Sequence, residues 1–274
     1  YIYFLYNYTG LDNMRNEGKL MRIWSKVPSA YQVRYAGVKG LLVAYPHDEI
    51  HGVTEEIVFT DSMWKYSPNT EEYKYIPLEI AAWSKPAKEE AYLNYQFIQA
   101  LDIAPDDLIG LAKDKLNQIK SDYLTDINKA KKALGLISRI GDDEEDSTFA
   151  TKLSKVLEAS ENMFTDKKVQ MSIKSLVSKF ILDMAKGRIP VSGSFVYIFS
   201  DPSYLFENKT VLNTGEAYWN NNTGVYAGFR SPLIHCSEVC KMNMVAKDEF
   251  WYIKDVLILN VYDDMLPRAS GADC

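Results

Sequence analysis

Residues 28–40 read Pro-Ser-Ala-Tyr-Gln-Val-Arg-Tyr-Ala-Gly-Val-Lys-Gly and run directly into an apolar stretch. Gln32 and Arg34 are two residues apart, so on a β-strand their side chains point to the same face. Lys39 stands between two glycines, which let a backbone or a ligand approach closely. An amide, a guanidinium and an ammonium group on one site suit a polyanion such as a triphosphate. The competing interpretation is a surface strand with two solvated cations.

Outward from this stretch, the chain divides into three zones. Residues 1–85 are strand-like, residues 86–186 are helical, and residues 187–274 are strand-like again. In the first zone, β-branched and apolar runs predict strands at 38–45 and 56–60. In the last zone they predict strands at 195–199, 225–229 and 255–262. The order β, then α, then β predicts an α+β fold.

Apolar residues in the middle zone recur at steps of three and four, which is typical of helices packed through one face. The spacing predicts one long helix over residues 108–137, followed by a solvated acidic loop at 142–146. A second stripe spans residues 149–163. The third stripe ends at Gly187 and consists of Val169, Ile173, Leu176, Val177, Phe180 and Met184.

Composition limits the classes of function. The chain has 274 residues, 47% of them hydrophobic, and a net charge of −6. Acidic residues outnumber basic ones in every zone, so a nucleic-acid site would have to be a local cluster rather than a basic face. We expect no membrane span and no secretory signal, because no apolar run is long enough and the first residues lack a basic flank. Three sparse cysteines predict a reducing, intracellular location, in the cytoplasm or nucleus.

The motif at residues 28–40 resembles the signature of cell-encoded, eukaryotic-type RNA-dependent RNA polymerases and their bacterial and phage relatives. In that family, Gln-x-Arg-Tyr-x-Gly-x-Lys-Gly lies in the first of two double-psi β-barrels. Residues 61–66 (Asp-Ser-Met-Trp-Lys-Tyr) resemble the family's Arg-Pro-Ser-Met-x-Lys-Phe motif, although the Arg-Pro is missing.

Further motifs follow in the family's order. Residues 91–96 (Ala-Tyr-Leu-Asn-Tyr-Gln) resemble the segment that opens the helical connector, and residues 187–191 (Gly-Arg-Ile-Pro-Val) resemble the entry to the second barrel. Residues 228–235 resemble the Arg-Asn-Pro-Cys-Leu-His motif. Residues 269–274 (Ala-Ser-Gly-Ala-Asp-Cys) resemble the start of Ser-Gly-Ser-Asp-x-Asp-Gly-Asp, so we expect a fragment that ends inside the aspartate motif.

The resemblance implies a fold and a chemistry. The first barrel would occupy residues 1–85, the helical connector 86–186 and the second barrel 187–274. Asp273 would be a catalytic ligand of Mg²⁺, with Mn²⁺ as the alternative ion, because alternate aspartates on a tight loop offer the oxygen ligands that these ions prefer. The remaining implied assignments are Lys39 and Lys65 as catalytic cations and Gln32, Arg34 and Arg230 as substrate or nucleic-acid contacts.

The resemblance implies synthesis of RNA from nucleoside triphosphates on an RNA template. Three alternatives stay open: a DNA template, as in a phage or bacterial relative acting in the host cytoplasm, a non-catalytic nucleic-acid-binding module, and a helical scaffold without polymerase chemistry. His235, Cys236 and Cys240 also raise the alternative of a zinc site, although structural zinc usually needs four ligands. Oligomeric state is left open.

Overall fold

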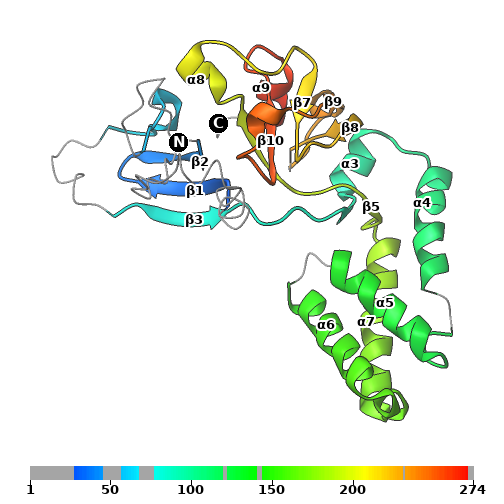
Figure 1. The fold of residues 1–274 in the computed structure, drawn as a ribbon. Coiled ribbons are helices and arrows are strands. Elements are labelled where there is room, and N and C mark those ends of the chain that lie inside the picture. Colours follow the sequence, from blue (N-terminus) through cyan, green and yellow to red (C-terminus); the bar gives the residue numbers. More distant parts are fainter. Residues whose placement is uncertain are drawn as a thin grey trace. The chain divides into compact units, whose positions relative to one another are not determined.

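The computed structural model describes residues 28–45, 57–67, 77–119, 122–140, 144–230 and 232–270. The chain divides into two compact units, whose elements are labelled in Figure 1. The first unit takes in Tyr1–Ala87, Val196–Ser231 and Ser237–Cys274, and the second takes in Lys88–Phe195 and Pro232–Cys236. The first unit is therefore assembled from segments that lie far apart in the sequence.

The first unit contains a three-stranded antiparallel sheet, coloured blue to cyan in Figure 1. Its strands are β1 (Ala30–Tyr35), β2 (Val38–Val43) and β3 (Glu79–Trp83), in the order β2-β1-β3. Side chains alternate along a strand, so one face of this sheet carries an apolar cluster. The buried members of that cluster are Tyr31, Val33, Val38, Leu42 and Met63. The strand expected at residues 38–45 is confirmed over Val38–Val43.

The strand expected at residues 56–60 is wrong in the part that the structure describes. Val58, Phe59 and Thr60 belong to no strand, and the chain then enters a short 3-10 helix, η2 (Asp61–Met63). The Phe59 ring stacks on the Tyr35 ring with centroids 5.7 Å apart. Packing against this side chain of β1 overrides the β-propensity of the segment.

A second sheet in the same unit has five strands in the order β6-β10-β7-β9-β8. The strands are β6 (Tyr197–Ser200), β7 (Glu216–Tyr218), β8 (Gly224–Gly228), β9 (Cys240–Met244) and β10 (Val256–Leu259). β10 pairs parallel with β6, and β7 pairs parallel with β9, whereas β10–β7 and β8–β9 are antiparallel. The strands expected at 195–199, 225–229 and 255–262 are confirmed, with ends that shift by one to three residues.

Apolar cores lie on both faces of strand β10, and this explains its unbroken Val-Leu-Ile-Leu sequence. Val256 and Ile258 belong to one core, which also takes in Ala30 and Val43 of the first sheet. Leu257 and Leu259 belong to the other. The first core therefore joins the two sheets of this unit.

The fold is α+β, as the order of the zones predicted. Within the described residues the strands form open sheets of three, five and two strands, and none of these sheets closes into a barrel. The expected pair of closed barrels is thus not seen in this part of the chain.

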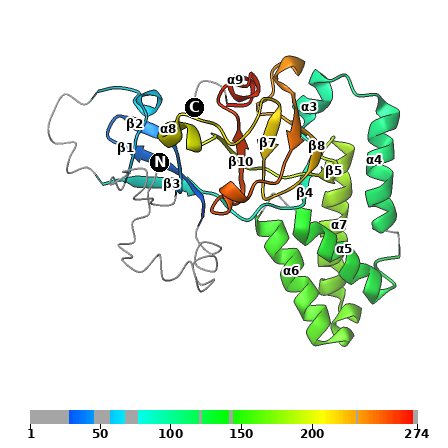
Figure 2. The same ribbon diagram turned by 45° about the horizontal axis from the view of Figure 1, so that its top comes forward.

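The second unit is mainly helical, as the green elements of Figure 2 show. Its helices are α3 (Tyr95–Ala100), α4 (Pro105–Gln118), α5 (Ile127–Ile140), α6 (Glu144–Ala159), the 3-10 helix η4 (Glu161–Thr165) and α7 (Lys167–Ala185). Two short strands, β4 (Glu90–Tyr92) and β5 (Pro190–Ser192), pair antiparallel. The remaining short helices of the described residues are α8 (Ser203–Glu207), η5 (Cys236–Glu238), η6 (Asp248–Phe250) and α9 (Met265–Ser270).

Helix α7 confirms the third apolar stripe. Its buried residues are Val169, Ile173, Leu176, Val177, Phe180 and Met184. Asp166 caps the helix by accepting from the backbone N–H groups of Lys168 and Val169 at 2.8 and 3.1 Å. Gly187, with φ of +89°, follows the last turn, a backbone conformation that favours glycine.

The single long helix expected over residues 108–137 is wrong, because the structure breaks it into α4 and α5. The Asp126 side chain accepts from the backbone N–H groups of Asn128 and Lys129 at 2.9 and 3.3 Å, so it caps a new helix. None of the residues of α4 is buried. The apolar spacing continues across the break, so periodicity alone could not locate it.

The acidic run at residues 142–146 is not simply a loop. From Glu144 onward the run belongs to helix α6, and residues 142 and 143 lie outside the described residues.

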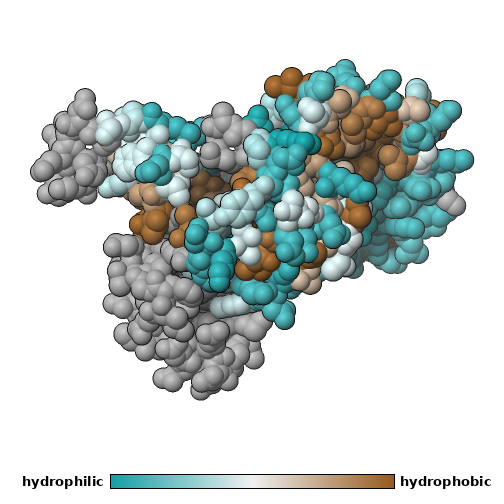
Figure 3. Space-filling view, turned by 90° about the horizontal axis from the view of Figure 1, so that it is seen from above, coloured by the Kyte–Doolittle hydropathy of each residue, from teal (hydrophilic) through white to brown (hydrophobic). Residues whose placement is uncertain are grey.

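The surface is mixed in character. Figure 3 shows hydrophobic patches among hydrophilic residues on the face seen from above, a distribution that is ordinary for protein surfaces. In the described part of the chain, no helix has the length and apolar character needed to cross a membrane.

Candidate functional site

The β1–β2 hairpin places three of the predicted site residues on one face. Arg34 pairs directly with Lys39 across the hairpin, and Gln32 pairs with Leu41. Cross-strand partners point to the same face, opposite the face that carries Val33 and its apolar cluster. Gln32, Arg34 and Lys39 therefore lie together, as the sequence predicted for Gln32 and Arg34.

This face carries both cationic and anionic side chains. Two cations directly opposite each other in a sheet repel, and Arg34 and Lys39 occupy such a pair. On the other side of β1, Glu79 of β3 is the partner of Arg34. Among the described residues, this face brings the cations of Arg34 and Lys39 together with the carboxylate of Glu79.

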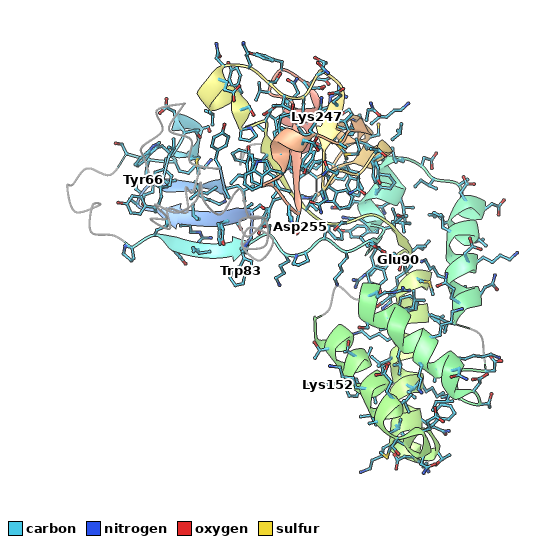
Figure 4. All side chains as sticks on the ribbon, in the orientation of Figure 1. Tyr66, Trp83, Glu90, Lys152, Lys247 and Asp255 are labelled. Atoms are coloured by element: carbon cyan, nitrogen blue, oxygen red, sulfur yellow. The ribbon has the colours of Figure 1, made fainter. Side chains whose placement is uncertain are left out.

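The segment that carries Lys65 docks on the tip of the same hairpin. Trp64 forms an antiparallel bridge with Val38. The backbone N–H of Lys65 donates to the carbonyl oxygen of Gly37 at 2.8 Å. The Tyr66 hydroxyl, labelled in Figure 4, donates to the carbonyl oxygen of Ala36 at 2.9 Å. Lys65 is thus fixed beside the hairpin that carries Arg34 and Lys39.

Two glycines in the hairpin allow this close docking. A Cβ atom on Gly37 would lie 1.9 Å from the carbonyl oxygen of Tyr66. A Cβ atom on Gly40 would lie 2.5 Å from the terminal carbon of Met63. The two motifs therefore fit each other sterically, because the glycines of residues 28–40 leave the space that residues 63–66 occupy.

The other two predicted site residues lie elsewhere. Arg230 follows β8, the edge strand of the five-stranded sheet, two residues after the strand ends at Gly228. Asp273 lies outside the described residues, so its predicted role as a metal ligand is not tested by the structure. The grouping therefore covers Gln32, Arg34, Lys39 and Lys65.

The motif-like segments of the second unit also meet in space. Tyr92 in β4 pairs with Pro190 in β5, and the N–H of Leu93 donates to the carbonyl oxygen of Ile189 at 2.8 Å. The guanidinium carbon of Arg188 lies 4.7 Å from the centre of the Tyr92 ring, a cation–π contact.

A third segment joins them through Gln96. Its side-chain oxygen accepts from the N–H of Leu233 at 3.2 Å. Asn94 caps α3 by accepting from the N–H of Gln96 at 2.8 Å. Residues 91–96 therefore contact both of the other segments that resemble the family, 187–191 and 228–235.

The cysteine-rich stretch forms no metal site in the described part of the chain. No three His, Cys, Asp or Glu residues gather there closely enough to hold a metal ion. Cys240 is buried in the apolar core beside β9, and burial raises the pKa of its thiol. Cys236 is exposed, with its sulfur 3.9 Å from Nδ1 of His235.

Sequence reasoning missed one group of polar residues at the end of β10. Asp201, Asn260 and Asp263 are all buried. In the sequence, the Asp-Pro at 201–202 and the Asp-Asp at 263–264 had the composition of turns between strands. The sequence signal that could have found them is an acidic residue just after an apolar strand. That signal does not show whether the carboxylate is buried or solvated.

Comparisons with known proteins show a likeness in fold and a match to a family. The chain is similar in structure to the RNA dependent RNA polymerase QDE-1 from Thielavia terrestris, with a TM-score of 0.58 and 17% sequence identity over 91% of this chain. It spans 30% of the length of that polymerase chain. No curated protein matches it. A sequence profile of the family described as RNA dependent RNA polymerase matches residues 12–273, and the chain therefore belongs to the RNA-dependent RNA polymerase family.

Proposed function

We propose that this chain is a core segment of an RNA-directed RNA polymerase, which transfers nucleotides from nucleoside triphosphates to the 3′ end of a growing RNA. Family membership supports the reaction class. The observation that carries the proposal is the shared face of Gln32, Arg34 and Lys39 on a hairpin against which the backbone of Lys65 docks and whose glycines fit the docked segment.

The proposed roles follow from the charge of the substrate. In nucleotidyl transfer, the RNA 3′ oxygen bonds to the α-phosphorus and pyrophosphate leaves, so negative charge develops on the phosphate oxygens. Lys39 and Lys65 would stabilise that charge as fixed cations. Arg34 and Gln32 would orient the triphosphate through hydrogen bonds, because guanidinium groups bind phosphate in a bidentate way. Arg230 would add a contact to substrate or nucleic acid from the second sheet.

The domain assignment is part of the proposal. Residues 1–85 would belong to a first double-psi barrel, 86–186 to the helical connector, and 187–274 to a second barrel. The compact helical unit at Lys88–Phe195 supports the assignment of the connector.

The proposed metal ligand is Asp273, with Mg²⁺ as the ion and Mn²⁺ as a substitute. The described residues contain no group of acids, histidines and cysteines that fits a metal ion, so this assignment rests on the resemblance of residues 269–274 to the family's aspartate motif. A bound divalent ion would neutralise phosphate charge.

A direct experiment compares templates. The longest natural form of the protein that contains this sequence is incubated with nucleoside triphosphates, Mg²⁺ and either single-stranded RNA or single-stranded DNA. We expect labelled nucleotides to be incorporated on RNA, and incorporation to stop when a chelator removes the metal. Incorporation on DNA alone would replace the proposal with DNA-directed synthesis. If the folded protein incorporates nucleotides on neither template, the polymerase proposal is wrong and a non-catalytic nucleic-acid-binding module is favoured.

Variants of the hairpin test the roles of single residues. Lys39→Ala and Arg34→Ala should slow incorporation at least tenfold without changing the thermal midpoint by more than a few degrees. Lys152→Ala is the matched control, because Lys152 is an exposed lysine on α6 in the other unit (Figure 4). Near-normal rates for both hairpin variants would refute the assigned roles.

A further inference from the structure

Three buried polar side chains surround the carboxyl end of β10. Asp201 is 0% exposed, Asn260 is 3% exposed and Asp263 is 6% exposed. Burying a carboxylate is costly unless hydrogen bonds replace its water. The hydrogen bonds of these three side chains link backbone segments that lie apart in the sequence.

Asp201 closes a segment of the chain on itself. Its carboxylate accepts from the N–H groups of Ser203 at 3.0 Å, Val211 at 2.6 Å and Leu212 at 3.1 Å. Its own N–H donates to the carbonyl oxygen of Leu259 in β10 at 2.8 Å. Residues 201–212, with α8 inside them, therefore form a loop whose two ends are fastened to one side chain beside β10.

Asn260 fastens the same loop to the residue that follows β10. Its side-chain amide donates to the carbonyl oxygen of Leu212 at 2.5 Å, and its side-chain oxygen accepts from the N–H of Tyr262 at 2.7 Å. The loop and the turn after β10 are thereby held against each other.

Asp263 extends this network to the last helix. One carboxylate oxygen accepts from the N–H of Met265, the first residue of α9, at 3.0 Å. The other accepts from the N–H of Gly215, beyond the loop that Asp201 closes. A single side chain thus bonds the start of α9 to a segment 48 residues earlier in the chain.

Asp264, the next residue, makes no comparable network among the described residues. Asp264 is exposed and pairs with Arg268 one turn later in α9. An exposed pair of this kind contributes little to stability. The buried position at 263 and the exposed position at 264 carry the same side chain in different environments.

We propose that Asp263 is a positioning residue that holds α9, whose last residues Ala269 and Ser270 begin the aspartate motif, against the second sheet. This inference rests on the proposed polymerase function. Nucleotidyl transfer tolerates little displacement of the groups at the reacting centre. Two backbone donors fastened to one rigid side chain restrict the helix more strongly than a helix cap alone.

The test uses substitutions that separate the two bonds, made in the longest natural form of the protein. Asp263→Asn keeps the size of the side chain but has one acceptor oxygen in place of two, so one of the two N–H groups faces the amide nitrogen. Asp263→Ser keeps an oxygen able to cap α9 but is too short to reach Gly215 as well. Asp264→Asn and Asp264→Ser are the matched controls one residue away.

Two measurements are made on each variant. Hydrogen exchange reports the protection of the amides of Gly215 and of the non-proline residues of α9, and steady-state incorporation reports kcat and the KM for nucleotide. For Asp263→Asn and Asp263→Ser we expect faster exchange at these amides and a kcat at least tenfold lower, with KM within about twofold. Both Asp264 variants should match the wild type in all of these quantities.

A purely structural role would give a different result. It predicts a lower thermal midpoint with unchanged kcat per folded molecule, and that outcome would overturn the inference. Wild-type exchange rates in Asp263→Ser would also overturn it, because the tie to Gly215 would then contribute nothing. A wild-type protein that incorporates no nucleotide would instead overturn the proposed function, and the role of Asp263 with it.

Discussion

Gly37 is the residue at which the hairpin and the segment of residues 61–66 approach most closely. The space for a side chain is occupied by the backbone carbonyl of Tyr66, which cannot move without breaking the hydrogen bond from Lys65 to Gly37. At Gly40 the obstacle is the flexible end of Met63. The two glycines therefore differ in how easily their surroundings adapt.

We expect Gly37→Ala to lower the free energy of unfolding by about 3 kcal/mol or more, since overpacking against a backbone atom forces a backbone shift. Gly40→Ala should cost about 1 kcal/mol, because Met63 can change its rotamer. Urea unfolding of both variants checks the difference. A smaller loss for Gly37→Ala than for Gly40→Ala would contradict the close docking.

Tyr218 is a buried tyrosine whose ionisation is coupled to stability. Its hydroxyl donates to the carbonyl oxygens of Phe250 and Ile253 at 3.2 and 3.4 Å. Burial, with a smaller contribution from Asp248, raises the pKa of Tyr218 to about 12 from an ordinary value near 10. The folded protein therefore holds the proton more tightly than the unfolded chain does.

The sign of the pH effect follows from this. The contribution of Tyr218 is complete below pH 10 and is lost as the pH rises towards 12, by up to about 1.4 kcal/mol per pH unit. Unfolding measured between pH 8 and 11 should show a shallower alkaline decline in Tyr218→Phe than in the wild type. Part of the decline should remain, because burial also raises the pKa of Tyr31. Identical slopes in the two proteins would contradict the assignment.

At the scale of the element, helix α7 packs one face into the core of the helical unit. Ile173 is fully buried in a core built from α5, α6 and α7, whereas Met171 on the same helix is 62% exposed. Helix stability in proteins comes mainly from such packing of one face rather than from propensity.

Ile173→Ala should therefore lower the free energy of unfolding by about 2–5 kcal/mol, through lost burial and the cavity left behind. Met171→Ala should change it by less than about 0.5 kcal/mol. Chemical denaturation followed by helical circular dichroism measures both. Equal losses in the two variants would mean that the face of α7 has been wrongly assigned.

At the scale of the whole molecule, the two units differ in how they are built from the chain. Among the described residues, the buried core of the helical unit draws on residues between Tyr92 and Met184. The core that joins the sheets combines Ala30, Val43 and Tyr45 with residues from Leu212 to Ile258. One unit is continuous in its core, and the other depends on segments far apart in the sequence.

We expect a fragment of residues 88–195 to fold alone, with a helical spectrum and a cooperative thermal transition. A fragment of residues 28–87 should remain unfolded, because the partners of Ala30, Val43 and Tyr45 are missing. Circular dichroism of the two fragments tests this contrast. Cooperative folding of the 28–87 fragment would show that the joint core is dispensable.

Much of this could be predicted from the sequence, and the exceptions have physical causes. The stripe on α7 and the strands at Val38–Val43 and Val256–Leu259 were correctly identified, because hydrophobic periodicity is a local property. The break between α4 and α5 was missed, because the cap at Asp126 interrupts the helix without interrupting the spacing. The strand at residues 56–60 was wrong because Phe59 packs on a residue distant in sequence.

By itself, the sequence determined the α+β class, the family, and the shared face of Gln32 and Arg34, since all of these depend on residue identity and local spacing. The roles of all six predicted site residues, from Gln32 to Asp273, remain predictions. Only the tertiary structure decided that Lys65 lies beside the hairpin, that Gln96 holds Leu233, and that Asp263 is buried while Asp264 is not. Those outcomes depend on which distant backbone groups supply hydrogen-bond partners. A local sequence pattern does not predict these partners, because they are brought together only by the tertiary fold.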